Sequence, residues 1–105
     1  MSVTRIHPTA LVDPGARLGV DVEVGPFVIL GPDVEVGDHC VIGARSTLLQ
    51  YVRLAEGVRL GEGVHLGGLP QDTKFKGEET WVEIGAHTVI REYSTINRAT
   101  TASFR

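Results

Sequence analysis

Aliphatic residues recur at every sixth position along this chain. Apart from one interval the series keeps its phase, and its members are Ile6, Val12, Leu18, Val24, Leu30, Val36, Ile42, Leu48, Leu54, Leu60, Leu66, Ile84, Ile90 and Ile96. Val or a smaller residue lies two positions before most of them, and Gly often follows directly. A period of six matches neither the α-helix nor the coiled coil, so the repeat predicts another regular structure.

Short apolar–polar alternations such as VDVEVG and GVRLGEGVHLG predict short strands with two faces. The glycine of each unit predicts a turn, where φ is positive or another backbone approaches closely. Short strands joined by regular corners predict a solenoid, a parallel β-helix, in which the inward aliphatics stack into one core. A β-sandwich of hairpins is the alternative, but it would show variable spacing and Asn-Gly or Asp-Gly turns, which the chain lacks.

One interval, at about residues 67–81, interrupts the repeat. Charged residues of both signs replace the alternation there, and insertions into solenoids often form functional loops. Asp72 and Lys74 are two apart, with Gln71 beside them, so an extended loop would direct the carboxylate and the ammonium toward one ligand. A carboxylate suits sugar hydroxyls and a lysine suits phosphate, a pairing that fits a sugar nucleotide. The alternative is a solvated surface loop whose charges only keep it soluble.

Composition and charge narrow the class of protein. The 105 residues are enough for one small domain, and the net charge of -3 argues against general nucleic-acid binding. The chain has neither a signal-peptide-like apolar run nor a membrane span, so a cytoplasmic protein is expected. The four histidines occupy outward or corner phases with the nearest pair 22 residues apart, so neither a metal nor another cofactor is expected. Cys40 falls in the small inward phase, which predicts a core residue.

The repeat resembles that of the hexapeptide-repeat acyltransferase superfamily, in which three hexapeptides form one triangular, left-handed coil. The run QDTKFKGEETWVEIGAHTVIREYSTINRAT and the opening IHPTALVDPGARLG look like one branch of it, the acyl-carrier-protein–UDP-N-acetylglucosamine O-acyltransferases. The resemblance implies an all-β fold: a left-handed parallel β-helix of hexapeptide repeats, a little under five coils long, with one protruding loop. It also implies a homotrimer.

The implied reaction transfers a 3-hydroxyacyl group from acyl carrier protein to the 3-hydroxyl of UDP-N-acetylglucosamine, the first step of lipid A synthesis. In that family the Asp and Lys of the loop help to bind the sugar nucleotide and the incoming acyl group between subunits. Asp72 and Lys74 match those positions, and Gln71 is a weaker candidate. Asn97 stands where the family usually has a His near the substrate; it can hydrogen-bond but cannot carry a proton as His can.

The general base of the family is a histidine on a coil beyond the Thr-Ile-x-Arg segment, and this chain ends at Arg105, before that coil. Residues 1–105 are therefore expected to form one β-helix segment without the C-terminal part of the family fold, without a catalytic residue, and inactive alone. Two alternatives stay open. One is a non-catalytic truncated solenoid for assembly or ligand binding, and the other is a different hexapeptide enzyme, such as an N-acyltransferase on a related sugar nucleotide.

Overall fold

The computed structural model describes residues 3–68 and 80–97, which form short β-strands in three sheets. Sheet A contains β1 (Arg5–Ile6), β4 (Glu23–Val24), β7 (Val41–Ile42), β10 (Arg59–Leu60) and β13 (Val89–Ile90). Sheet B contains β2 (Leu11–Val12), β5 (Ile29–Leu30), β8 (Thr47–Leu48), β11 (His65–Gly68) and β14 (Thr95–Asn97). Sheet C contains β3 (Arg17–Leu18), β6 (Val34–Val36), β9 (Val52–Leu54) and β12 (Val82–Ile84). Within these ranges no helix has the length and hydrophobicity needed to cross a membrane.

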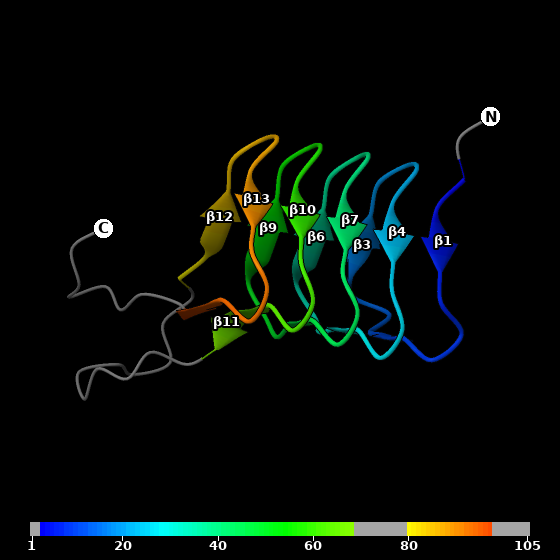
Figure 1. Ribbon diagram of the computed structural model, residues 1–105, viewed down its shortest axis with the longest axis horizontal. Coiled ribbons are helices and arrows are strands. Elements are labelled where there is room, and N and C mark those ends of the chain that lie inside the picture. The colour runs from blue at the N-terminus through cyan, green and yellow to red at the C-terminus, as the bar shows by residue number, and fades with distance from the viewer. Residues whose placement is uncertain (1–2, 69–79, 98–105) are drawn as a thin grey trace.

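The chain visits sheets A, B and C in turn, so three strands make one coil and every strand pairs with the strand of the next coil. All of these pairings are parallel, for example β4 with β7 and β6 with β9. The coils stack side by side along one axis (Figure 1). The architecture is a left-handed parallel β-helix, which confirms the expected all-β fold.

The core is a single column of inward side chains. The repeat aliphatics and the residues two before them fill it, and from Val22 to Leu66 most of these side chains are almost fully buried. Two of the predicted inward aliphatics are not buried: Ile6 is 45% exposed and Ile96 is 37% exposed. They lie in the first and last described coils, which have a described neighbouring coil on one side only.

The left-handed backbone positions do not coincide with the glycine that follows each aliphatic. They come three residues after the aliphatic, at Asp21, Phe27, Asp33, His39, Arg45, Tyr51, Gly57, Gly63, His87 and Tyr93. For a residue other than glycine this conformation costs about 1–2 kcal/mol. Backbone hydrogen bonds to the neighbouring coil offset the cost, as where the His39 N–H donates to Val20 O at 2.9 Å.

The repeat glycines serve close approach between coils instead. A Cβ on Gly43 would lie 2.6 Å from Gly61 O in the next coil, although the φ of Gly43 is not positive. Of the two roles that the sequence leaves open for these glycines, close approach therefore applies to most of them. Gly67, with a φ of 82°, is an exception.

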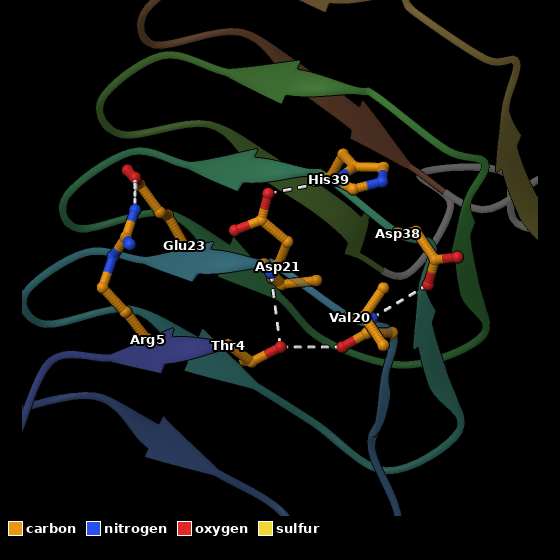
Figure 2. A network of polar contacts seen from close by, with 9 residues as sticks. Thr4, Arg5, Val20, Asp21, Glu23, Asp38 and His39 are labelled. Carbon is orange, nitrogen blue, oxygen red and sulfur yellow. Dashed lines mark hydrogen bonds and ion pairs between the residues drawn. The ribbon is translucent and has the colours of Figure 1, made fainter. Parts of the chain in front are cut away.

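Polar side chains link the coils where backbone groups would otherwise lack a partner. Figure 2 shows this for the first coils, where the Val20 N–H donates to Asp38 Oδ1 at 2.9 Å. Thr4 Oγ1 donates to Gly19 O at 2.8 Å and accepts from the Val22 N–H at 3.3 Å. Because each hydrogen bond joins an atom of one coil to an atom of another, these contacts fix the spacing of the stack.

Candidate functional site

The insertion leaves and rejoins the solenoid at one corner. β11, in sheet B, ends at Gly68, and β12, in sheet C, begins at Val82. Val82 pairs with Val52, 30 positions earlier, whereas Val52 pairs with Val34, 18 positions earlier. The interrupted coil therefore holds 12 additional residues, and the chain returns in the same register and inward phase. We call this place the B–C corner.

β11 carries a bulge directly before the insertion. Its register against β14 shifts between Leu66 and Gly68, which makes Gly67 an extra residue. A Cβ on Gly67 would lie 2.7 Å from Gln50 O, and the φ of Gly67 is 82°. Glycine is thus required by both the backbone conformation and the space. The strand extends two residues into the interval of about 67–81 expected from the sequence, and the bulge sets Gly68 opposite Asn97.

Asn97 is the last residue of β14, and its side chain is exposed. A Cβ on Gly68 would lie 2.8 Å from Asn97 Oδ1, so the amide lies directly over the glycine backbone. Leu49 Cδ1, from the preceding coil, is 4.0 Å from the same point. Asn97 therefore places a hydrogen-bond donor and acceptor where the insertion begins, without the titratable proton that an imidazole would supply.

Aromatic and charged side chains surround the return of the insertion. The ring centroids of Tyr51 and Trp81 are 5.4 Å apart, with the planes inclined by 54°. The guanidinium carbon of Arg53 is 4.5 Å from the Trp81 ring centroid, which is cation–π distance. Arg53 Nε donates to Glu35 Oε1 at 3.0 Å and Nη1 donates to Glu83 Oε2 at 2.5 Å. The hydrogen bond to Glu35 is the largest of the effects that raise the pKa of Arg53.

Gln71, Asp72 and Lys74 lie outside the described residues. Of the four expected substrate-binding residues, the structure therefore places Asn97 alone. It does place both ends of the segment that carries the other three, and Asn97 lies at the same corner.

The cluster of Tyr51, Arg53 and Trp81 was not predicted from the sequence. Two signals point to it: the single Trp of the chain is the last residue of the interval, and a strand resuming in phase after the interval pairs Arg53 with Glu83. Finding these contacts from sequence requires knowing how many residues the insertion adds to its coil.

A groove of about 750 Å³ runs along the outer face of sheet C. Its lining includes an alternating ladder of charges: Arg17, Glu35, Arg53 and Glu83. Arg53 forms ion pairs with both carboxylates beside it. Because opposite charges are adjacent, their fields largely cancel. The groove therefore attracts an anionic ligand less strongly than unpaired arginine side chains would.

The four histidines are on the outside, as predicted: His7, His39, His65 and His87 are all exposed. His39 Nδ1 lies 3.1 Å from Asp21 Oδ2 (Figure 2). In residues 3–68 and 80–97, no group of three or more His, Cys, Asp or Glu side chains is arranged to hold a metal ion.

Cys40 is fully buried in the core. Its Sγ donates a hydrogen bond to Ala55 O at 3.1 Å, and burial raises the pKa of the thiol. The burial confirms the prediction of a core residue. A protonated, inaccessible thiol is also a poor nucleophile.

Comparison with known proteins finds mainly UDP-N-acetylglucosamine O-acyltransferases, and a GDP-perosamine N-acetyltransferase from Caulobacter crescentus superposes with a TM-score of 0.52 at 27% identity. Residues 15–50 match the family model described as bacterial transferase hexapeptide (six repeats). Over 98 residues the chain is 51% identical to the acyl-[acyl-carrier-protein]–UDP-N-acetylglucosamine O-acyltransferase of Paraburkholderia xenovorans, an alignment covering 93% of this chain and 37% of that protein. The chain thus spans a little over a third of the length of the curated relatives it matches.

Solved structures agree with the sequence comparison. A UDP-N-acetylglucosamine acyltransferase from Bacteroides fragilis superposes with a TM-score of 0.91 at 42% identity, covering 94% of this chain and 39% of that chain. LpxA from Acinetobacter baumannii superposes with a TM-score of 0.88 at 37% identity, covering 90% and 37% of the two chains.

Proposed function

We propose that this chain, which is similar to part of the UDP-N-acetylglucosamine O-acyltransferases and shares a hexapeptide repeat with bacterial transferases, takes part in the reaction of those enzymes. The reaction transfers a 3-hydroxyacyl group from acyl carrier protein to the 3-hydroxyl of UDP-N-acetylglucosamine, at the start of lipid A synthesis. The observation that carries the proposal is the 51% identity over 93% of the chain, which includes the insertion.

The proposal assigns the sugar nucleotide to the insertion and the B–C corner. Asp72 accepts hydrogen bonds from sugar hydroxyls, Lys74 attracts the diphosphate, and Gln71 contributes a further hydrogen bond. Asn97 supports this assignment, because its exposed amide lies beside Gly68 at the start of the insertion. A general base and an acyl-carrier contact are not assigned to any residue of this chain.

A homotrimer is part of the same proposal. Leu11 is 67% exposed and Ile29 is 41% exposed, and the two are paired on the outer face of sheet B. Covering this apolar ladder with another copy would gain about 25 cal/mol per Å² of apolar surface. Light scattering is expected to give three times the mass of one chain, and the mass of a single chain at all concentrations would contradict this part.

A transfer assay tests the reaction. The protein that carries this chain is incubated with 3-hydroxyacyl-acyl carrier protein and UDP-N-acetylglucosamine, and the product is identified by mass spectrometry. An ester on the sugar 3-hydroxyl is expected. An amide product would instead identify an N-acyltransferase, and a folded protein that gives no acylated sugar nucleotide would contradict the proposed function.

A further inference from the structure

We propose that Arg53 is a positioning residue for the sugar-nucleotide site, because it anchors Trp81 and so fixes the end of the insertion at the B–C corner. The anchor itself is inferred from described residues. Its effect on ligand binding rests on the proposed function, and the experiments below separate the two.

The register of the sheet brings the anchor together. Pairing of Val52 with Val82 sets Tyr51 opposite Trp81 and places Arg53 one step further along the same strand. The Val82 N–H donates to Tyr51 O at 2.9 Å, which holds the backbone at the point of return. Outward side chains that face each other across paired strands stabilise that pairing. Trp81 therefore meets the solenoid through contacts with both Tyr51 and Arg53.

Arg53 joins the coil before the insertion to the strand after it. Glu35 belongs to the preceding coil and accepts from Nε, while Glu83 belongs to β12 and accepts from Nη1. The same guanidinium lies over the Trp81 ring at 4.5 Å. A planar guanidinium can donate hydrogen bonds to two carboxylates and stack on an aromatic ring at the same time, which a lysine ammonium cannot. One side chain thus ties the returning chain to two coils.

The position is distinct from the rest of its ladder. Arg17 faces the same groove and pairs in register with Glu35, but it lies in β3, three coils away from β12 and the insertion. Arg17→Gln therefore removes the same charge from the same face without touching Trp81. Trp81 is the single Trp of the chain, so all of the Trp fluorescence comes from the side chain that Arg53 contacts.

The first experiment measures the anchor without ligand. Acrylamide quenching and the emission maximum of Trp81 are compared in the wild type, Arg53→Gln, Arg53→Lys and Arg17→Gln. Arg53→Gln is expected to increase quenching and shift the emission to the red, Arg53→Lys to fall between it and the wild type, and Arg17→Gln to match the wild type. Equal quenching in Arg53→Gln and the wild type would overturn the anchor.

The second experiment measures binding of UDP-N-acetylglucosamine by calorimetry. Arg53→Gln is expected to raise the Kd about three- to tenfold, a change typical of losing exposed ion-pair and cation–π contacts. In a Trp81→Phe background the same substitution is expected to have a smaller effect, because Arg53 acts through Trp81. Additive effects, or an unchanged Kd in a variant whose Trp81 has become accessible, would overturn the positioning role.

Quenching and calorimetry together distinguish a failure of the anchor from a failure of the proposed function. Wild-type protein that is folded but binds no sugar nucleotide would contradict the proposed function, and the positioning role with it, while the quenching comparison still decides the anchor. Thermal melting controls for general destabilisation: Arg53→Gln is expected to melt only slightly below Arg17→Gln, because exposed ion pairs contribute little to stability. A melting temperature that falls in proportion to the loss of binding would mean a purely structural role.

Discussion

Replacing Gly43 with Ala tests the close stacking of neighbouring coils. Gly43 follows the inward Ile42, and a Cβ there would lie 2.6 Å from both the carbonyl carbon and the oxygen of Gly61. These are backbone atoms of the next coil and cannot rotate away, while ordinary contact begins at 3.4 Å. The coils must therefore separate locally, which stretches the 2.9 Å hydrogen bond from the Gly43 N–H to Leu60 O.

The cost follows from overpacking and from the stretched hydrogen bond. Overpacking a close-packed site costs about 1–3 kcal/mol, and weakening one backbone hydrogen bond adds about 1 kcal/mol. The free energy of unfolding is thus expected to fall by about 2–4 kcal/mol. For a chain of this size each kcal/mol lowers the Tm by about 4–8 °C, so we expect a drop of about 10–30 °C.

Gly85→Ala is the matched control. Gly85 also follows an inward aliphatic and its φ is not positive, but among the described residues the nearest atom to its Cβ would be Thr88 Oγ1 at 3.9 Å. Ala is expected to be neutral there or to stabilise by about 0.4–1 kcal/mol. Thermal melts followed by circular dichroism, at equal protein concentration, compare the two variants. Equal melting temperatures would refute the argument that Gly43 is required for close approach.

Two further substitutions address the buried polar groups. Ser46 Oγ donates to Gly61 O at 3.0 Å and accepts from the Val64 N–H at 3.2 Å, so Ser46→Ala is expected to cost about 1–3 kcal/mol and to lower the urea midpoint without changing the m value. The pKa of Cys40 is raised above 9.0 by burial, so the unfolded thiol ionises first and stability is expected to fall as the pH rises past about 9, until the folded thiol also ionises. Cys40→Ser, whose hydroxyl can still donate to Ala55 O, is expected to lack this fall.

Controls for both are available in the same chain. Ser46→Cys keeps a donor at a position equivalent to that of Cys40 and is expected to lose less stability than Ser46→Ala. An unchanged urea midpoint in Ser46→Ala would contradict the importance of its two hydrogen bonds. For Cys40, parallel pH profiles of the wild type and the Ser variant would show that the thiol does not couple to folding.

The fold was predictable because each hexapeptide repeats the same pattern of inward and outward side chains. A small inward residue, an outward residue and an inward aliphatic recur without a change of spacing, so a shift in register would turn the whole core outward. Val34, Val52 and Val82 keep this phase even across the insertion. The handedness came only from the resemblance.

The left-handed positions were not predictable in the same way. Phe27, Arg45 and Tyr51 adopt a positive φ that their residue types disfavour. Hydrogen bonds between coils override the local preference, and such bonds appear only once the coils are stacked. The contact of Arg53 with Trp81 was not predicted for a related reason: it depends on the length of the insertion.

Calorimetric titration of UDP-N-acetylglucosamine into wild type, Asp72→Asn and Glu79→Gln tests the central claim most directly. Both substitutions remove one carboxylate charge from the insertion, but only Asp72 is proposed to contact the ligand. We expect saturable binding to the wild type and to Glu79→Gln, with a Kd about 10- to 100-fold higher for Asp72→Asn, the loss expected for one charge-assisted hydrogen bond. Equal affinities in all three proteins, or no binding by folded wild type, would contradict it.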